Sequence, residues 1–540
     1  MMPIFRFSIV LALMVALARI GFDAQANGQG PVPAYQVAWT HQYGTGDEEQ
    51  ALGIAFDGVG ELYTSGYTNG SIGTIGPANA GQSDAFAGKF DLAGNAQWLT
   101  QGGTSGIDKN TGVAADTLGN VFTAGISLGP LNLVGSQATL THYGTDGAPT
   151  WTQIFGTPQT FAYGVAADGA GNAYITGSTR GTVTGLNLTG GYMAYIAKYN
   201  SAGGLQWADQ FGASGHDQAY AIASDGAGSV YVAGATTGSL GGANAGNNDA
   251  FVRKYTTNGT TQWTEQLGTS ADDFAKAVAA DSMGNVFIAG STSGALAGNT
   301  SAGLDDAFVS KFNTTGTLQW STQIGTAGND YISAATTDSH GDVFVAGYTQ
   351  GSLGNTNAGN YDAFVSELDG AGNLLWTRQL GTPAADYIGG ITIDAKGNIY
   401  VSGSTLGSLA GANQGSFDAW IARFSAPVLG DMNHDFQLTN ADLQAMISAL
   451  TNPTAFKQSL GLTDADYLAL GDANGDGQVN AADINALLNI LAGNPIQSQS
   501  GAIGSANVVP EPDSAVLWMI GVPAVSIFSA ARMRRQMRFN

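Results

Sequence analysis

Seven tryptophans recur along this chain at a nearly constant interval, and this period constrains the fold more than any other feature of the sequence. Successive spacings are 59, 53, 56, 56, 57 and 56 residues. A fixed period of this length indicates a solenoid, a propeller or another repeat array, in which each unit is one supersecondary motif. The seven residues are Trp39, Trp98, Trp151, Trp207, Trp263, Trp320 and Trp376.

The unit around Trp263 contains four short apolar segments, each bounded by Gly, Asn, Asp or Ser. They span residues 262–267, 275–280, 285–291 and 306–312, and they are rich in Val, Phe, Ile and Trp. This composition is typical of strands rather than helices. Four strands in one unit make a propeller blade. Seven units therefore predict an all-β fold, a seven-bladed β-propeller with four-stranded blades over residues 35–425.

The order of the segments predicts how the ring closes. Residues 37–43 form a tryptophan segment that no other blade segment precedes, and residues 418–424 form a last segment that no tryptophan segment follows. Inside the array, the corresponding two segments follow each other directly and should pair as a hairpin. We therefore expect the N-terminal strand to lie antiparallel to residues 418–424 and to close the last blade, which leaves no open edge at the seam.

One acidic residue occupies the same position in every unit and is followed three residues later by Gly. Asp at the first and Gly at the fourth position is typical of a type I turn, in which the carboxylate accepts local N–H groups. Recurrence in every unit favours a hairpin turn over a catalytic role. These residues are Asp57, Asp116, Asp168, Asp225, Asp281, Asp338 and Asp394.

A second acidic position lies ten residues after the tryptophan, in the loop that leads to the next segment. We expect these side chains to ring one face of the disc, and a capping role is favoured over ligand binding. The position holds Glu49, Asp108, Asp217, Asp273, Asp330 and Asp386, and the third unit has a deletion there.

The runs D-x-x-G-N-V-Y-V-A-G-x-T and D-A-F-V-x-K-Y give the repeat region a family resemblance. Between Trp39 and Phe424 the chain resembles the SBBP class of bacterial β-propeller repeats. The resemblance weakens in the second unit, where residues 137–140 replace D-A-F-V, and in the third, where residues 193–196 do. It implies a fold and no single activity.

Two acidic twelve-residue loops follow the repeats. Such a loop supplies calcium with oxygens from positions 1, 3, 5, 7 and 12, and Gly at position 6 permits the sharp turn. The second loop has Gly477 at position 6, whereas the first has Phe436, so we expect the first site to be weaker. The expected ligands are Asp472, Asn474, Asp476, Gln478 and Asp483 in the second loop and Asp431, Asn433, Asp435, Gln437 and Asp442 in the first.

An amphipathic segment follows each loop, at residues 441–450 and 481–491, where apolar residues recur at helical spacing. Paired loops with Asp at position 12 resemble type I dockerin domains, over residues 428–494. The resemblance implies a small α-helical, EF-hand-like domain that folds with calcium and binds a cohesin-like protein. A structural calcium clamp without such a partner is the alternative.

Both ends of the chain carry export signals. Residues 1–26 combine a basic start, an apolar run and an A-x-A site, which predicts a secretory signal peptide. After a linker at 495–508, residues 509–540 combine V-P-E-P, an apolar run long enough for a transmembrane helix, and an Arg cluster. This order resembles the PEP-CTERM sorting signal. The resemblance implies transient membrane anchoring, cleavage by an exosortase-type protease, and delivery to the cell surface or extracellular matrix, with a permanent anchor as the alternative.

The net charge of the chain and its short sequence motifs limit the functions that it can have. A net charge of −23 disfavours nucleic-acid binding, and the absence of Cys excludes disulfides and thiolate metal sites. The G-x-S-x-G match at Gly125–Gly129 is a variant of the repeat, with no helix after it. We therefore expect no enzyme and no catalytic or cofactor-binding residues, but a scaffold that contacts protein or polysaccharide through its propeller faces.

A polysaccharide hydrolase or lyase on the same scaffold is the alternative function. Aromatic residues clustered over one loop face would favour glycan binding. Two converging carboxylates beside a His would favour the enzyme.

Overall fold

The computed structural model describes residues 35–492, apart from 74–77, 130–134, 158, 184–190, 427, 434–436, 461 and 463. The predicted signal peptide, the linker and the sorting segment lie outside the described residues. Within the described part, no helix combines the length and the apolar character needed to cross a bilayer. A long region of strands is followed by a short helical region.

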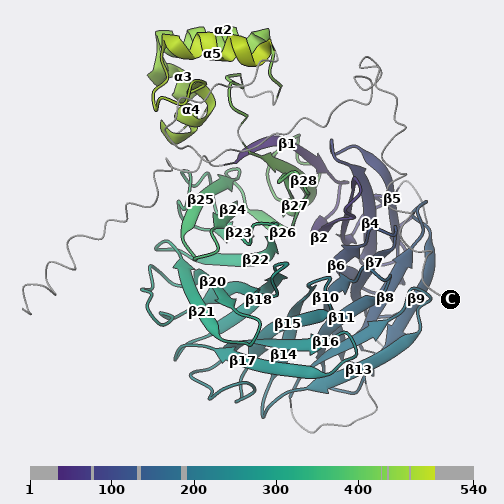
Figure 1. The fold of residues 1–540 in the computed structure, drawn as a ribbon. Coiled ribbons are helices and arrows are strands. Elements are labelled where there is room, and N and C mark those ends of the chain that lie inside the picture. Colours follow the sequence, from purple (N-terminus) through teal and green to yellow (C-terminus); the bar gives the residue numbers. More distant parts are fainter. Residues whose placement is uncertain are drawn as a thin grey trace, which may run out of the picture. The chain divides into compact units, whose positions relative to one another are not determined.

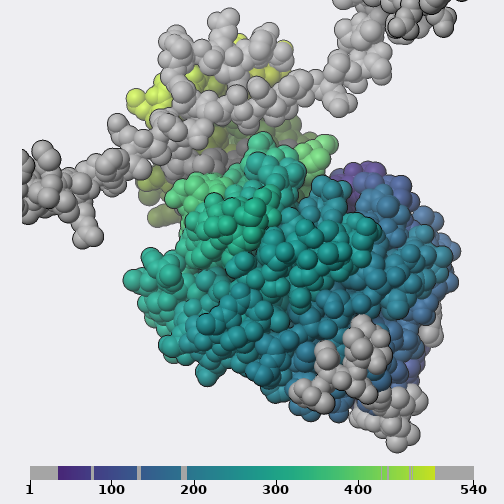
Figure 2. Space-filling model, turned by 60° about the horizontal axis from the view of Figure 1, so that its bottom comes forward, coloured from purple at the N-terminus to yellow at the C-terminus, as the bar shows by residue number. Residues whose placement is uncertain are grey.

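The strands form seven four-stranded antiparallel sheets, so the repeat region is the predicted seven-bladed β-propeller. The sheets follow one another around a central axis in chain order (Figure 1). In the space-filling view, the teal and blue blades form one continuous surface (Figure 2). Within each blade, one strand contacts the equivalent strands of both neighbouring blades, which makes it the innermost strand and closes the ring. The innermost strands of blades one to seven are β2 (Glu49–Phe56), β6 (Asp108–Ala115), β10 (Thr160–Ala167), β14 (Asp217–Ser224), β18 (Asp273–Ala280), β22 (Asp330–Thr337) and β26 (Asp386–Ile393).

The second and third strands of each blade form the core, because neighbouring blades cover them on both sides. Every residue of β19 is buried, for example, which explains why such strands read as continuous apolar runs without alternation. The second strands are β3 (Glu61–Thr68), β7 (Val121–Ser127), β11 (Ala173–Thr179), β15 (Ser229–Thr236), β19 (Val286–Thr292), β23 (Val343–Thr349) and β27 (Ile399–Thr405). The third strands are β4 (Asp84–Asp91), β8 (Gln137–Tyr143), β12 (Met193–Tyr199), β16 (Asp249–Thr256), β20 (Asp306–Phe312), β24 (Asp362–Leu368) and β28 (Asp418–Ser425).

The outermost strands carry the recurring tryptophans. In blades one to six, each tryptophan strand pairs with the third strand before it in the chain, and these strands are β5 (Ala96–Gly102), β9 (Pro149–Phe155), β13 (Leu205–Phe211), β17 (Thr261–Leu267), β21 (Leu318–Ile324) and β25 (Leu374–Leu380). In blade seven, the outermost strand is the N-terminal β1 (Gln36–Tyr43), which lies antiparallel to β28 with Thr40 opposite Ala422 (Figure 1). The predicted closure by the N-terminal strand is confirmed.

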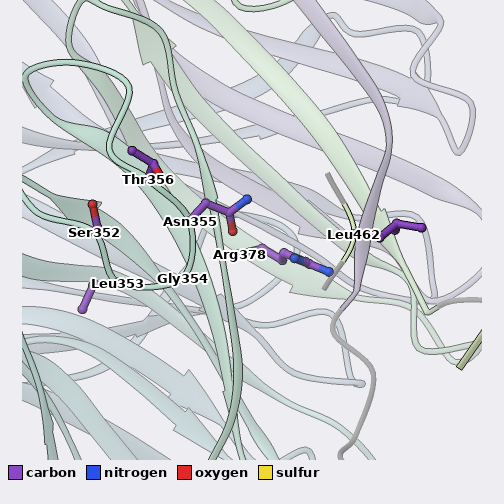
Figure 3. Close-up of a pocket in the computed structure, with 7 residues that line it drawn as sticks. All are labelled: Ser352, Leu353, Gly354, Asn355, Thr356, Arg378 and Leu462. Carbon is purple, nitrogen blue, oxygen red and sulfur yellow. The ribbon is translucent and has the colours of Figure 1, made fainter. Parts of the chain in front are cut away.

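Tyr35, directly before β1, ties the seam to blade six. Its ring stacks on Trp376 of β25, with ring centroids 5.1 Å apart, and meets Phe344 edge-on at 6.1 Å. Its carbonyl oxygen accepts a hydrogen bond from Arg378 Nε at 2.9 Å. Figure 3 shows Arg378 beside the loop 352–356 of the same blade. The N-terminal strand is therefore held by two blades.

The hairpin between the first two strands of each blade depends on the recurring Asp–Gly pair. In blade five, Asp281 Oδ1 accepts hydrogen bonds from the backbone N–H groups of Met283 (3.0 Å) and Asn285 (2.8 Å), and Gly284 has a φ of 82°. The equivalent Asp in each of the other six blades accepts the same pair of bonds, and each equivalent Gly has a positive φ. The turn interpretation of these aspartates is confirmed.

Among the described residues after the propeller there are four short helices: α2 (Asn440–Thr451), α3 (Pro453–Leu460), α4 (Asp464–Gly471) and α5 (Ala481–Leu491). The first and last lie where helical spacing predicts them, and the two between them were not expected. α2 contacts α5, and Met446 and Leu487 are fully buried in one apolar cluster. This cluster is the core of the helical region.

Candidate ligand-binding face of the propeller

All blades present the same end of their strands to one face of the ring. In blade five, Asp273 at the start of β18 lies opposite Thr292 at the end of β19, which lies opposite Asp306 at the start of β20. We name the face that carries these ends the upper face. The opposite, lower face carries the hairpin turns described above.

The second recurring acid begins the innermost strand and lies inside it, rather than in the preceding loop as expected. Asp273 is fully buried, and its Oδ2 accepts hydrogen bonds from Thr269 N (2.6 Å) and Thr269 Oγ1 (3.0 Å). Equivalent bonds reach Glu49, Asp108, Asp330 and Asp386. Asp217 accepts from the backbone of Ala213 and from the hydroxyl of Thr236. The expected capping role is therefore confirmed. Burial raises the pKa of four of these carboxyls, which we name the raised aspartates: Asp217, Asp273, Asp330 and Asp386.

In five blades, a second buried carboxylate lies close to the acid that begins the innermost strand. Asp249, the first residue of β16, is fully buried, and its Oδ2 accepts bonds from Ala245 N (2.7 Å) and Gln266 Nε2 (2.8 Å). Its negative charge adds to the rise in the pKa of Asp273. A Cβ at Gly268 would lie 2.4 Å from Asp249 Oδ1, so the chain requires glycine here. The related pairs are Asp84 with Asp108, Asp306 with Asp330, Asp362 with Asp386, and Asp418 with Glu49.

Every innermost strand contains a β-bulge at its fourth residue, where the pairing register with the second strand shifts. A bulge turns a side chain to a new direction and is common beside functional sites. Tyr163 and Tyr220, from blades three and four, contact each other with centroids 5.7 Å apart, and Lys276 Nζ of blade five lies 3.3 Å from the Tyr220 centroid. The bulge residues of blades three, four and five thus contact one another on the inner side of the ring. We name the set the bulge ring: Leu52, Thr111, Tyr163, Tyr220, Lys276, Ser333 and Gly389.

Half-buried aromatic residues form two separate groups on the upper face, and the rings within each group contact one another. In the first, on blades three and four, Phe161 stacks on Tyr163 with centroids 6.2 Å apart and planes 2° apart. Phe161 also contacts Tyr192 at 5.9 Å, and Tyr163 contacts Tyr220. These four rings form a continuous aromatic surface from the bulge ring outward.

The second aromatic group lies on blades six and seven. The Tyr348 ring contacts those of Tyr331, Tyr361 and Tyr387, with centroids 5.2, 5.4 and 5.0 Å apart. Tyr387 also contacts Tyr361 at 5.6 Å and Phe417 at 5.9 Å. Phe274 of blade five, which contacts Lys276 at 5.1 Å, occupies the same repeat position as Tyr331 and Tyr387.

Sequence reasoning did not identify these aromatic residues. A signal was present, because the residue after the second recurring acidic position is aromatic in several units. It reads Gln50, Lys109, Phe161, Gln218, Phe274, Tyr331 and Tyr387. A half-buried position that is aromatic in four of seven units and Gln or Lys in the others indicates a surface that serves recognition rather than packing.

The arrangement that would favour an enzyme is not seen on the described part of the upper face. His216 contacts the Tyr192 ring at 5.9 Å and lies beside the single buried carboxyl of Asp217. The hydrogen bond that His340 donates to Asp338, followed by the charges of Asp338 and Asp342, raises the pKa of His340. These three residues occupy an exposed hairpin turn on the lower face. Gly125 lies within strand β7 and forms no nucleophile elbow.

The second predicted calcium loop is held by its own carboxylates. Asp472 accepts hydrogen bonds from Asp476 N (2.9 Å) and from Gly477 N (2.7 Å), and Gly477 has a φ of 83°. Asp483 is fully buried and accepts bonds from Asn474 N (3.0 Å) and Asn480 N (2.8 Å). These contacts give the loop the tight turn that calcium ligation requires at its sixth position.

The first loop repeats part of this pattern. Asp442 is fully buried and accepts bonds from Asn433 N (3.2 Å) and Thr439 N (2.8 Å), which match the two bonds at Asp483. Asp431 is also buried. The other expected ligand Asp435 and the bulky Phe436 lie outside the described residues.

The charge distribution in the second loop fits a cation. Burial, followed in effect by the negative charges of Asp472 and Asp476, raises the pKa of Asp483. Within the described residues, however, no three His, Cys, Asp or Glu side chains converge as a metal centre. Neutral oxygens supply two of the five expected ligands, Asn474 and the Gln478 carbonyl. Asp442 and Asp483 also complete capping boxes at the starts of α2 and α5, which is a second reason for their burial.

The chain is similar to known proteins mainly through its repeats. Among curated proteins, it is 28% identical over 288 residues to the regulatory protein FlaEY of Caulobacter vibrioides, covering 46% of this chain and 30% of that protein. It is 24% identical over 168 residues to the uncharacterized WD repeat-containing protein L264 of Acanthamoeba polyphaga mimivirus, covering 25% of this chain and 12% of that one. The chain therefore spans less than a third of the length of either relative.

The chain is also similar to solved structures at low sequence identity. The polysaccharide lyase Uly1 is 10% identical, with a TM-score of 0.41, and the match covers 76% of this chain and 95% of the lyase. A luciferin-regenerating enzyme is also 10% identical, with a TM-score of 0.34, and the match covers 73% of this chain and 95% of the enzyme. The β-propeller repeat model named SBBP matches residues 150–183, 206–241, 262–296, 319–355 and 375–410. The chain thus carries SBBP β-propeller repeats in a seven-bladed propeller.

Proposed function

We propose that this protein is an exported cell-surface or matrix scaffold, without catalytic activity, that binds a polysaccharide on the upper face of its propeller. The observation that carries the proposal is the pair of aromatic groups on that face. One face of a sugar ring is formed by C–H groups, which pack on aromatic rings, while tyrosine hydroxyls offer hydrogen bonds. Aromatic clusters left accessible on a polar surface mark interaction sites.

The tyrosine hydroxyls of the two groups are suited to donate hydrogen bonds to sugar oxygens. Burial raises the pKa of Tyr348 to about 12, and it raises the pKa of Tyr163, Tyr220 and Tyr331 as well. These phenols therefore stay protonated at neutral pH and act as donors. Tyr331 already donates to Asp305 Oδ2 at 2.7 Å, which orients its ring.

Ring truncation in the second group tests the proposal. We expect Tyr387→Ala and Tyr348→Ala in the full chain to weaken binding to an immobilised polysaccharide at least tenfold, about 1.4 kcal/mol. Tyr387→Phe keeps the ring and should stay within about threefold of the wild type, about 0.7 kcal/mol. Binding that survives both alanine substitutions would contradict a role for these rings in glycan recognition.

We further propose that the two acidic loops bind calcium and that the helical region assembles with a cohesin-like protein. Bound calcium would supply a positive charge that balances the buried acids of each loop. In the second loop, Asp472, Asn474, Asp476, Asp483 and the Gln478 carbonyl would hold the ion. The hydrogen bonds that these carboxylates accept from their own loop support the proposal, because they orient the side chains before a metal arrives.

We also propose that the protein is exported to the surface, as its two predicted terminal signals indicate. We expect cell fractionation to find the protein outside the cytoplasm. Intact-mass measurement of the surface form should show that residues 1–26 and the segment beyond Pro512 are absent. Detection of Trp518 in the surface form would favour a permanent anchor instead.

A further inference from the structure

Lys276 places a positive charge at the axis of the ring. It is the bulge residue of β18, because the register with β19 shifts between Ala275 and Ala277. Its Nζ lies 3.3 Å from the ring centroid of Tyr220 in the neighbouring blade and 5.1 Å from that of Phe274. The ammonium is therefore held by aromatic faces, a cation–π arrangement.

No acidic group on the neighbouring elements balances this charge. None of the ion pairs among the described residues includes Lys276. The other six members of the bulge ring are apolar, hydroxylic or glycine, so none carries a carboxylate. Burial lowers the pKa of Lys276 to about 8, and no carboxylate acts against that shift. At neutral pH the side chain is mostly charged, without a counter-charge, in a chain of net charge −23.

Three acids on the same face accept hydrogen bonds from neutral donors. Glu48 accepts hydrogen bonds from Tyr67 Oη (2.6 Å) and from Gln50 Nε2 (2.8 Å). Asp305 accepts from Tyr331, and Asp272 accepts from Asn248 Nδ2 at 2.7 Å. A second cation, Arg180, lies 4.6 Å over the Tyr192 ring in the first aromatic group. Aromatic rings that carry exposed or uncompensated cations are suited to a ligand that combines apolar rings with negative charge.

We propose that Lys276 binds the carboxylate or sulfate group of an acidic polysaccharide, so that the ligand of the upper face is an anionic glycan. This rests on the polysaccharide-binding role proposed above and names its ligand class. The anionic group takes the place of the missing counter-charge at the axis. The sugar rings on either side then pack on the tyrosines of blades three, four, six and seven.

The test measures binding of the full chain to three polymers: polygalacturonate, which carries carboxylates, dextran sulfate, which carries sulfates, and uncharged dextran. We expect Lys276→Met to weaken binding to an acidic polymer at least tenfold, since it removes a charge-assisted hydrogen bond, and Lys276→Arg to retain it. The matched control is Lys254→Met, which removes a lysine that lies 5.2 Å over Tyr231 in blade four but on a third strand, near its lower end. This control should bind like the wild type.

The outcomes separate this inference from the polysaccharide-binding proposal. Loss of polygalacturonate binding alone, or of dextran sulfate binding alone, supports the inference and identifies the anionic group. Unchanged acidic-polymer binding by Lys276→Met overturns it, even if Tyr387→Ala still abolishes binding. Tight binding of dextran with none of either acidic polymer also overturns it and leaves the wider proposal standing. Because Lys276→Met removes a half-buried charge, its thermal stability should not fall, which excludes misfolding as the cause of lost binding.

Discussion

Truncation of Tyr35 should open the seam of the propeller. Its ring makes two aromatic contacts with blade six, to Trp376 and Phe344. Such contacts contribute ~0.5–1.5 kcal/mol each. The bond from Arg378 survives the substitution because it uses the main-chain carbonyl of residue 35. We therefore expect Tyr35→Ala to lower the free energy of unfolding by about 2 kcal/mol.

Urea unfolding followed by tryptophan fluorescence measures this effect selectively. Eight of the nine tryptophans lie between residues 39 and 420, so the signal reports on the propeller and not on the helical region. Tyr35→Phe is the matched control, since it keeps both ring contacts and should change the free energy by less than about 0.5 kcal/mol. A loss below that value for Tyr35→Ala, or an equal loss for both variants, would refute the view that this ring secures the seam.

Three further predictions concern other parts of the molecule. Calorimetric titration of the full chain with calcium should lose one binding event in Asp472→Ala and change less in Asp431→Ala, whereas no heat of binding in the wild type would exclude calcium. Gly268→Ala should destabilise the propeller by ~1–3 kcal/mol, because its Cβ would lie 2.4 Å from Asp249 Oδ1. Gly411→Ala is the control and should be neutral in the same unfolding assay, since its Cβ would meet no atom within 4 Å. The raised aspartates hold their protons more tightly in the folded state than in the unfolded state, so the stability of the propeller should increase as the pH falls from neutral through their pKa values. A melting temperature that only decreases over that range would contradict the raised pKa of these four carboxyls.

The repeat architecture could be predicted because a regular period of this length is compatible with few folds. Equal spacing of Trp263 and its equivalents set the number of blades. An unmatched strand at each end of the array determined that β1 closes against β28. The two turn positions also followed from residue chemistry, since Asp281 and Gly284 have the same roles in every blade.

The ligand-binding face could not be predicted in the same way. Tyr163 and Tyr220 are 57 residues apart in the chain, and only the packing of one blade on the next brings their rings into contact. A sequence pattern does not reveal the bulge that turns Lys276 toward the axis, because the bulge depends on pairing with β19. The prediction that the second recurring acids lie in a loop was wrong by one residue, because each of them is the first residue of a strand. The pattern of apolar and polar residues does not distinguish the first residue of a strand from the last residue of the loop before it. The helices α3 and α4 span only eight residues each, which leaves few apolar positions from which helical spacing could be identified.

The bulge ring has a consequence for how such a protein changes over time. A bulge residue stands outside the hydrogen-bonded ladder, so its side chain can be exchanged without breaking strand pairing. Leu52, Lys276 and Gly389 occupy the same place in three blades, which shows that one backbone accepts an aliphatic chain, a cation or no side chain at all. Ligand recognition at the axis therefore depends on seven residues, each of which can be replaced independently of the others. A new ligand preference can arise by point substitution while the scaffold that displays it is inherited unchanged.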